Sequence, residues 1–155
     1  MPSLLYSEAE GELSALSQFC QNVLRDSFWP VEEFSLSLKI PQTFLLYRPS
    51  SVSNAWQGFA LGRVMGGTAE LFFIFVHPDV RGQGLASAIL SDFEAYSLNT
   101  FQAVSVLLEV RISNDAAIRL YERSGYKRIH TRKRYYQDGE DAALYEKPLP
   151  SEKKG

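Results

Sequence analysis

The feature of this sequence that most restricts its fold is a glycine-rich connection between an apolar strand and an amphipathic helix. Leu71–Val76 is predicted to be a strand that is apolar on both faces, and a helical pattern follows from about Gly84 to Tyr96. Between them, Gly82 and Gly84 permit turns with positive φ and leave room for a ligand against the backbone. A strand that is apolar on both faces belongs in the middle of a sheet, so the sequence predicts an α/β domain.

The start of this predicted helix offers a place for an anion. The first turn of a helix leaves N–H groups unpaired and carries the positive end of the helix dipole, and such a place holds a phosphate or pyrophosphate. Arg81 adds a fixed positive charge beside it. Three interpretations compete: an ordinary connection rich in turn residues, a dinucleotide site, and an acyl-coenzyme site.

The dinucleotide interpretation fits only in part. Gly82–Ser87 nearly matches Gly-x-Gly-x-x-Gly and Glu109 lies downstream, but His77–Arg81 separates the strand from the first glycine. A Walker A loop is excluded because no Gly-Lys-Ser/Thr follows. Arg81, Gly84 and Ala86 match the Arg-x-x-Gly-x-Ala loop of acetyltransferases, in which backbone amides hold the pyrophosphate of acetyl-CoA. With the rest of the chain considered, this third interpretation is preferred.

Composition excludes several other classes. A chain of 155 residues is long enough for one domain with a sizeable core, and a net charge of −2 gives no general affinity for polyanions. No apolar run reaches the roughly 18 residues of a membrane span, and the N-terminus has no leader pattern. The single Cys20 points weakly to a reducing, cytoplasmic setting. One cysteine and two histidines are too few and too scattered for a metal site.

The periodicity of the remaining segments predicts a mixed sheet flanked by helices. We expect helices at 9–24, 31–38, 84–96 and 113–123, and strands at 43–47, 57–64, 70–76, 104–110, 126–131 and 142–147. The Ser113-Asn114-Asp115 segment supplies a cap for the last helix, and Gly125 ends it.

Glu109 lies near the end of the otherwise apolar strand Val104–Val110. Alternation places it on the face opposite Val106 and Leu108. A carboxylate there is expected to be partly removed from water, which makes it a better base. The alternative is a structural pair with Arg111 or a position at an exposed sheet edge, and spacing alone does not decide between them.

Tyr121 and Asn114 each have an ordinary structural role as the alternative to a chemical one. Tyr121 shares a helix face with Ala117 and Ile118, so packing in the core competes with a role as general acid. Asn114 is equally well explained as the helix cap. A basic run follows and is typical of a solvated face: Arg119, Arg123, Lys127, Arg128, Arg132, Lys133 and Arg134. Tyr135 and Tyr136 lie directly beside it.

Together these segments resemble the GNAT acyltransferase superfamily, and more narrowly its RimI-type group, which acetylates the N-terminal alanine of a small-subunit ribosomal protein. Val76–Ala86 and Asn114–Tyr121 are, as a pair, typical of the superfamily; Leu108–Arg111 and Tyr135–Ala142 indicate the narrower group. The resemblance covers about residues 10–149. It implies a GNAT fold, with a mixed, mostly antiparallel central sheet flanked by helices. It also implies a single acetyltransferase domain over 1–149, with a charged, mobile tail at 150–155.

The resemblance further implies a role for each matching position. Glu109 would be the general base, through water, and Tyr121 the general acid that protonates the leaving thiolate. The implied contacts with acetyl-CoA are Phe75, Val76, Arg81, Gly82, Gln83, Gly84, Leu85, Ala86 and Asn114. Because these segments contain no credible covalent nucleophile, direct attack in a ternary complex is the expected course.

Two departures from the RimI-type pattern concern the acceptor. Phe73-Ile74-Phe75-Val76 stands where that group has Asn-Ile-Ala-Val, which gives a bulkier wall beside the acetyl and acceptor region. Phe28-Trp29-Pro30 stands where the group has Phe-Pro-Trp.

The preferred function is therefore a cytoplasmic enzyme that acetylates the N-terminal α-amine of a protein, with a ribosomal protein as the expected acceptor. It requires no membrane and no nucleic acid. The second hypothesis keeps the fold but takes a small cationic amine, which would need carboxylates near Glu109; outside the matched segments only Glu32 and Glu33 offer them. The third is a non-catalytic acyl-CoA-binding module, which loss of Glu109 or Tyr121 would have marked. Both residues are present.

Overall fold

A computed structural model describes residues 3–6, 31–50 and 56–150 of the chain. The helix expected at 9–24, the Phe28-Trp29-Pro30 segment and the tail at 151–155 lie outside the described residues. The elements are β1 (Leu4–Leu5), α2 (Val31–Leu38), β2 (Thr43–Pro49), β3 (Trp56–Met65), β4 (Thr68–Val76), α3 (Leu85–Phe101), β5 (Ser105–Arg111), α4 (Asp115–Arg123), β6 (Lys127–Arg132) and β7 (Ala142–Pro148).

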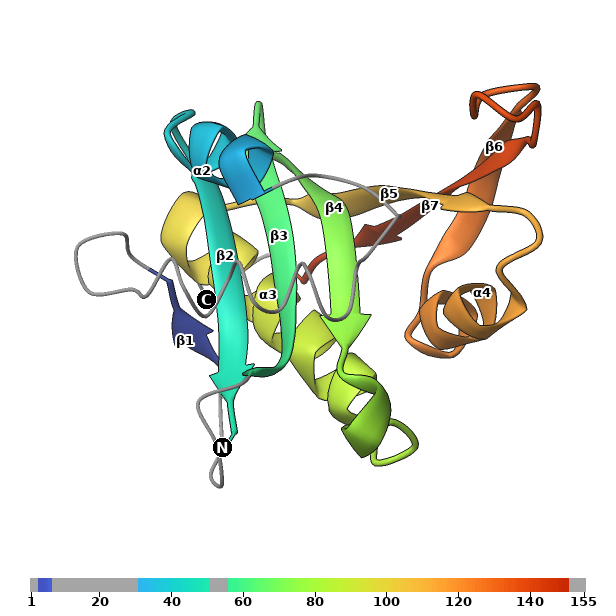
Figure 1. Ribbon diagram of the computed structural model, residues 1–155. Coiled ribbons are helices and arrows are strands. Elements are labelled where there is room, and N and C mark those ends of the chain that lie inside the picture. The colour runs from blue at the N-terminus through green and yellow to red at the C-terminus, as the bar shows by residue number, and fades with distance from the viewer. Residues whose placement is uncertain (1–2, 7–30, 51–55, 151–155) are drawn as a thin grey trace. The chain divides into compact units, whose positions relative to one another are not determined.

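The strands form one seven-stranded sheet in the order β1-β2-β3-β4-β5-β7-β6 (Figure 1). β4 and β5 run parallel, whereas β1–β2, β2–β3, β5–β7 and β6–β7 run antiparallel. β4 is the fourth of the seven strands, which confirms the central place predicted from its two apolar faces. No helix within the described ranges is long and apolar enough to cross a bilayer.

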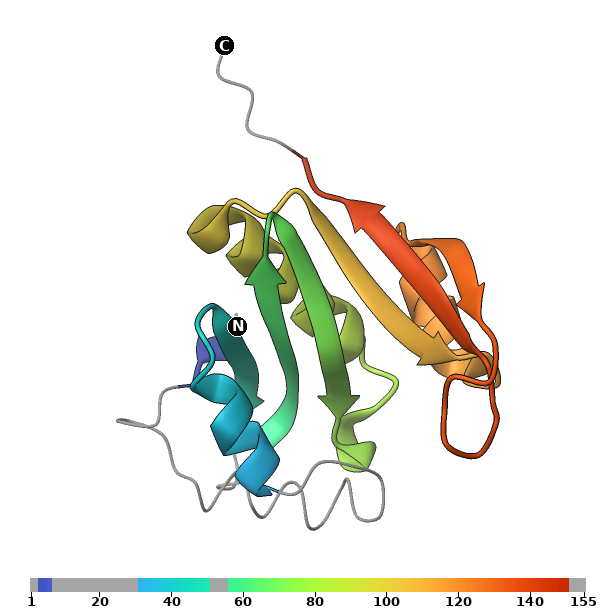
Figure 2. The ribbon, with the colours of Figure 1, turned by 90° about the horizontal axis from the view of Figure 1, so that it is seen from above.

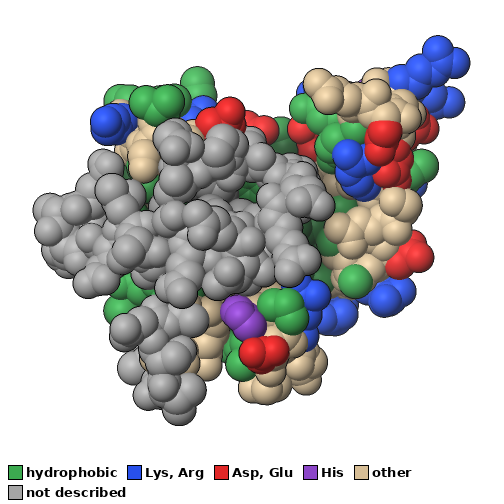
Figure 3. Space-filling view, in the orientation of Figure 1, with side chains coloured by type: hydrophobic (Ala, Val, Ile, Leu, Met, Phe, Trp, Pro, Cys, Tyr) green, Lys and Arg blue, Asp and Glu red, His purple; other side chains and the backbone are tan. Residues whose placement is uncertain are grey.

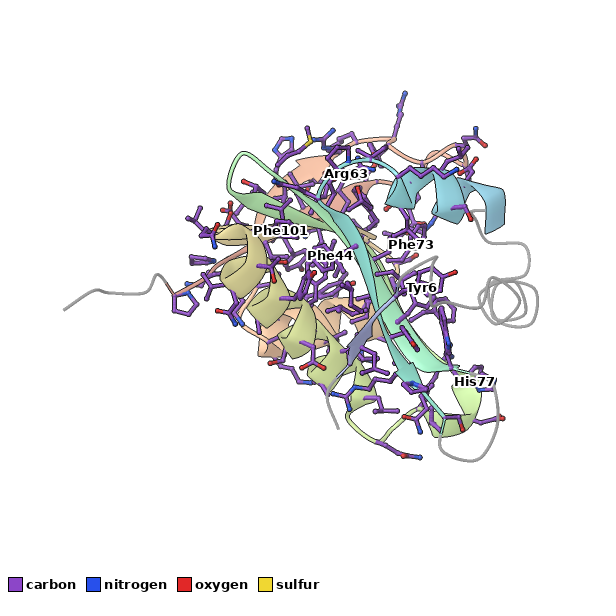
Figure 4. The ribbon with its side chains drawn as sticks, turned by 90° about the vertical axis from the view of Figure 1, so that its left-hand side faces the viewer. Tyr6, Phe44, Arg63, Phe73, His77 and Phe101 are labelled. Carbon is purple, nitrogen blue, oxygen red and sulfur yellow. The ribbon has the colours of Figure 1, made fainter. Side chains whose placement is uncertain are left out.

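The chain divides into two units, the first made of residues 1–63 and 73–93 and the second of residues 64–72 and 94–155. In the first, β2 and β3 pair from Thr43↔Arg63 onward, and α3 begins against them. Phe44 stacks on Phe93 of α3 with ring centroids 5.1 Å apart, between the strands and the helix (Figure 4).

A partly buried ion pair also connects elements of the first unit. Arg48 of β2 lies 2.9 Å from the Oδ2 atom of Asp92, and the Ser3 N–H donates to the same oxygen at 2.9 Å. Burial raises the pKa of Asp92, but hydrogen bonds from Ser3 and the charge of Arg48 outweigh it and leave the pKa below its usual value. The carboxylate therefore joins β2 and α3 to Ser3, the residue directly before β1.

In the second unit, β7 lies between β5 and β6, and α4 lies beside them (Figure 2). The inner face consists of Val106, Leu108 and Val110 of β5 with Tyr145 of β7, all buried. As predicted, this face of β5 alternates with the one that carries Glu109. Polar groups at the border of the core are paired, since the Tyr126 hydroxyl donates to Glu94 at 2.8 Å and Lys147 reaches the same carboxylate at 2.9 Å.

Candidate active site

The glycine-rich loop begins where β4 ends. The His77 N–H donates to the Gln57 carbonyl oxygen at 2.7 Å, so the chain leaves the sheet at a fixed point (Figure 4). A single 3₁₀ turn, Pro78–Val80, follows, and the His77 Nδ1 accepts a hydrogen bond from the Asp79 N–H at 3.1 Å. The intervening residues that weakened the dinucleotide interpretation are therefore an ordered turn between strand and loop.

Gly82 and Gly84 have the positive φ values that the sequence predicted, 81° and 78°. A Cβ atom built on either would meet nothing within 4 Å among the described residues, so the backbone is open to that part of the chain on this side. The first hydrogen bond at the start of α3 runs from the Ala88 N–H to the Gly84 carbonyl oxygen at 3.1 Å. The N–H groups before Ala88 lie outside the helical ladder and remain for a ligand. This cradle fits a pyrophosphate group.

Arg81 is attached to the end of β4. Its Nε donates to the Val76 carbonyl oxygen at 2.9 Å, and its guanidinium carbon lies 5.7 Å from the centre of the Phe75 ring. The residue itself stays exposed. The charge predicted beside the loop is thus present, and two of the other predicted coenzyme contacts, Phe75 and Val76, hold it there.

Gly58 of β3 allows a close approach at the same point. A Cβ atom there would lie 2.5 Å from the Phe75 carbonyl oxygen and 2.9 Å from the Ile89 side chain. Only glycine leaves β4 and α3 where they are. The sequence alone does not reveal this role of Gly58, because a glycine inside a strand pattern also marks bulges and bends.

Glu109 is the first residue of β5 beyond its parallel pairing with β4, which runs from Thr68↔Ser105 to Leu71↔Leu108. Its side chain is 21% exposed, and its Oε2 lies 3.0 Å from the Nε of Arg132 on β6. The Glu109 carboxylate also raises the pKa of the nearby Tyr135, through hydrogen bonding and its charge together with burial. The expected partial burial is therefore present.

Arg111 is not the partner of Glu109, contrary to the structural alternative drawn from the sequence. Its Nη1 lies 2.9 Å from Asp138 and 2.8 Å from Glu140, and its guanidinium carbon lies 4.0 Å from the Tyr136 ring centre. The hydrogen bond that Arg111 donates to Glu140 is the main cause that raises the pKa of Arg111. The residues that bind it follow β6, so counting along β5 did not reveal them.

Tyr121 and Asn114 lie at the two ends of α4. Tyr121 is 6% exposed and packs on Tyr126 and Tyr145, with ring centroids 5.8 Å and 6.5 Å away. Burial raises its pKa above the usual range, so the phenol stays protonated at neutral pH. Asn114 is the N-cap, as predicted, since its Oδ1 accepts a hydrogen bond from the Ala117 N–H at 3.2 Å.

The candidate residues thus fall into two groups. Phe75, Val76 and the loop Arg81–Ala86 lie in the first unit, whereas Glu109, Asn114 and Tyr121 lie in the second on consecutive elements. Arg132 and Tyr135 join the second group. The sequence drew attention to both only as members of a basic and aromatic surface.

The chain is similar in sequence to a family of known proteins and to several of its individual members. The sequence profile described as "Acetyltransferase (GNAT) family" matches residues 15–126. The N-alpha-acetyltransferase RimI of Mycobacterium tuberculosis is 32% identical over 120 residues, 76% of this chain and 73% of that protein. The [Ribosomal protein bS18]-alanine N-acetyltransferase of Escherichia coli K12 is 40% identical over 94 residues, 59% of this chain and 63% of that protein. An uncharacterized N-acetyltransferase of Methanocaldococcus jannaschii is 38% identical over 96 residues, 62% of each chain, so the match spans less than two thirds of several relatives.

Solved structures agree with the predicted fold. The crystal structure of the ribosomal-protein-S18-alanine N-acetyltransferase from Escherichia coli superposes with a TM-score of 0.80 at 29% identity, covering 99% of this chain and 97% of that one. The NAA60 protein of Arabidopsis thaliana in complex with acetyl-CoA gives a TM-score of 0.79 at 17% identity, over 95% and 97% of the two chains. At that identity the likeness concerns the fold alone.

Proposed function

The chain belongs to the acetyltransferase (GNAT) family, and on that premise we propose that it moves an acetyl group from acetyl-CoA to the α-amine at a protein N-terminus. The observation that carries this proposal is the carboxylate of Glu109, one-fifth exposed and held in place on β5. An α-amine has a pKa near 8 and a lysine side chain one near 10.4, so deprotonation costs about 3 kcal/mol less. A single carboxylate base suffices for an N-terminal acceptor.

The loop of the first unit supplies the coenzyme contacts. The backbone N–H groups of Gly82–Ala86 hold the pyrophosphate, and the charge of Arg81 offsets part of its charge. Phe75 and Val76 line the coenzyme at the end of β4. Asn114 uses its side-chain oxygen on the helix cap, so its amide NH₂ is the group left to contact the coenzyme arm.

The chemical step needs one base and one acid. Acetyl-CoA supplies an acetyl group that is already activated as a thioester. Glu109 takes the proton of the acceptor amine through water, and the amine nitrogen then bonds directly to the carbonyl carbon as the carbon–sulfur bond breaks. Tyr121 gives its proton to the sulfur, and the second proton lost by the nitrogen as the amide forms restores the phenol. Burial raises the pKa of the leaving thiol as it raises the pKa of the phenol. Because both pKa values shift in the same direction, the proton can still pass from the phenol to the sulfur.

The acceptor we propose is the N-terminus of a ribosomal protein, because relatives at 39% and 40% identity are named [Ribosomal protein bS18]-alanine N-acetyltransferase. Phe73 and Phe75 are both partly exposed on β4. We expect these bulky rings to alter which first residues are accepted. The cytoplasmic setting stays a prediction, as does the single domain over residues 1–149.

The proposal is tested by incubating the purified chain with acetyl-CoA and a panel of acceptors while free thiol is measured. The panel holds peptides beginning Ala-Arg, Ser and Met, a peptide with an internal lysine and a blocked N-terminus, and spermidine. We expect turnover only on free N-termini. Turnover confined to lysine or spermidine would refute the N-terminal assignment.

Glu109→Gln tests the base. We expect the variant to bind acetyl-CoA as the wild type does and to lose turnover by about 100-fold or more, because the amide cannot accept the amine proton. Binding is measured by calorimetry and turnover by thiol release. Near-normal turnover would exclude Glu109 as the base.

A further inference from the structure

Two side chains from beyond its own strand lie beside the Glu109 carboxylate. Arg132 on β6 places its Nε 3.0 Å from Glu109 Oε2, and Tyr135, three residues later, lies close enough for the same carboxylate to raise its pKa. The guanidinium carbon of Arg132 also lies 5.6 Å from the centre of the Tyr135 ring. Arg132 therefore contacts both Glu109 and Tyr135.

A β-bulge in β6 brings Arg132 to the face that carries Glu109. β6 pairs with β7 as Arg128↔Tyr145 and then as His130↔Leu144, so Ile129 is an extra residue. Leu144 is also the partner of Glu109 on β5, and Arg132 pairs with Ala142 two residues away. Cross-strand partners share a face. Without the extra residue Arg132 would lie opposite Asp141, on the other face.

Bulges often re-aim a side chain beside an active site. Here the path of Arg132 toward Glu109 crosses the small Ala142. The bulge and the alanine together let a residue on the outer strand reach a carboxylate on β5, two strands away.

Other charged or titratable groups lie on the same face of the sheet as Glu109. Arg111, on the same strand, is bound by Asp138 and Glu140 and covered by the Tyr136 ring. Glu70 on β4 and Glu109 both raise the pKa of Tyr135, whereas Arg132 lowers it. His130 stands on the same face across Leu144. Acidic and basic side chains lie side by side at the upper right of Figure 3, in the second unit. Among the described residues, Arg132 is the cation paired with Glu109.

The contact with Arg132 leaves the Glu109 carboxylate able to act as a base. An ionised carboxylate has about four acceptor positions, and Arg132 approaches one of its two oxygens. Other positions remain for water or for the acceptor amine. Because the Arg132 side chain is 50% exposed, the pair contributes little to stability. The main effect of the Arg132–Glu109 pair is therefore to restrict the orientation of the Glu109 carboxylate.

We propose that Arg132 and Tyr135 are positioning residues for Glu109, which fix its carboxylate in the orientation that takes a proton from the acceptor amine. This inference rests on the proposed role of Glu109 as the base. A displacement of about 1 Å at a reacting group can cost up to 100-fold in rate, so fixing the carboxylate is a large effect.

Steady-state kinetics of three variants test the proposal. Arg132→Gln removes the cation, Arg132→Lys keeps it in another shape, and Lys133→Gln removes a neighbouring exposed cation as the matched control. We expect Arg132→Gln to lower kcat by about 10- to 100-fold while the KM for acetyl-CoA changes by less than about twofold. Arg132→Lys should recover part of the loss, and Lys133→Gln should behave as the wild type.

Three kinetic results would overturn the proposal: an unchanged kcat in Arg132→Gln, a raised kcat in that variant, or an equal loss in Lys133→Gln. A raised kcat would mean that Arg132 covers the base. Thermal unfolding of each variant shows whether a loss of kcat comes from a loss of structure. A wild-type chain that acetylates no N-terminal peptide would instead refute the proposed function.

A titration of the tyrosines tests the contact without any activity. The chain has 8 tyrosines, and ¹³C labelling with Tyr135→Phe as the reference identifies the signal of Tyr135 by NMR. Glu109→Gln should lower the pKa of Tyr135, because the hydrogen bond to Glu109 is the main cause that raises it. Arg132→Gln should raise that pKa further. A pKa of Tyr135 that neither variant changes would overturn the proposal, whatever the kinetic measurements give.

Discussion

Gly58 illustrates how one missing side chain sets the position of a proposed coenzyme contact. The Cβ of an alanine there would lie 2.5 Å from the Phe75 carbonyl oxygen, which as a backbone atom cannot turn away. We expect Gly58→Ala to lower the free energy of unfolding by about 1–3 kcal/mol, as overpacking does. Binding of acetyl-CoA should weaken as well, because Phe75 and Val76 must move. Urea denaturation and calorimetry measure the two effects, and an unchanged variant would show that β4 yields freely.

Removing the Tyr121 hydroxyl can distinguish a structural role from a chemical one, although the side chain is buried. Its ring is packed, yet among the described residues its hydroxyl has no hydrogen-bond partner. Tyr121→Phe should therefore change the free energy of unfolding by less than about 1 kcal/mol. The same variant should lower kcat by about 100-fold or more, because no proton is then available for the leaving sulfur.

Tyr145→Phe is the matched control for Tyr121→Phe. Tyr145 is equally buried, but its hydroxyl donates to Glu122 at 2.9 Å. Its loss should cost about 1 kcal/mol of stability and leave kcat unchanged. If both variants lost stability and neither lost turnover, Tyr121 would be a packing residue.

The connection between β6 and β7 is an ordered element, although it contains no regular structure. Glu140 accepts a hydrogen bond from the Ser113 N–H at 2.8 Å and pairs with Arg111 at 2.8 Å, which ties the connection to the end of β5 and the start of α4. The Arg134 N–H donates to Asp141 at 2.8 Å. The segment that presents Tyr135 is therefore fixed at both ends.

Glu140 makes this attachment depend on pH. Hydrogen bonds from Ser113 and Arg111 hold the pKa of Glu140 below its usual 4.5. A carboxyl with a lowered folded-state pKa stabilises the fold above its unfolded pKa, and this stability is lost as the pH falls through the folded value. We expect Glu140→Gln to be less stable than the wild type at pH 6, with the difference shrinking toward pH 3. Urea denaturation at both pH values measures it; a constant difference would contradict the assignment.

For the complete chain, binding of acetyl-CoA should appear as added stability. A ligand that binds only the folded state adds about 2.7 kcal/mol at 100 times its dissociation constant. We expect acetyl-CoA to raise the thermal midpoint and S-acetylpantetheine, which lacks the pyrophosphate, to raise it far less. In Gly84→Val, where a β-branched residue would have to adopt a φ of 78°, the acetyl-CoA shift should be lost. Equal shifts by both ligands would exclude the loop as the pyrophosphate site.

Local pattern was sufficient for most of the fold. The apolar faces of β4 predicted its central place, Asn114 predicted a helix cap, and Gly82 and Gly84 predicted the open loop, because each depends on neighbours within one turn or strand. α3 ran past the predicted end at Tyr96 to Phe101, since it ends at Gln102 in the left-handed region at φ 54° and not at a glycine. β1 has two residues, which is too short for a period to show.

The partners of the candidate base were beyond the reach of the sequence. Arg111 looked like the neighbour of Glu109 because it follows two residues later on the same face. Its actual partners, Asp138 and Glu140, come from a connection 27 and 29 residues away. Arg132 reaches Glu109 only because of the bulge at Ile129, and a single extra residue leaves no periodic signal in a strand of six.

The extra residue Ile129 decides which β6 side chains lie on the same face of the sheet as Glu109, and this matters when the chain is aligned with its relatives. A relative with one residue fewer between Gly125 and the Tyr135–Tyr136 pair would present the opposite set of β6 side chains to its carboxylate, even if every letter around the gap were the same. An alignment gap placed one position away would equate residues that face opposite sides of the sheet. In this part of the family, lineages are therefore best compared by counting inward from Ala142 on β7, where the pairing is regular up to Leu144.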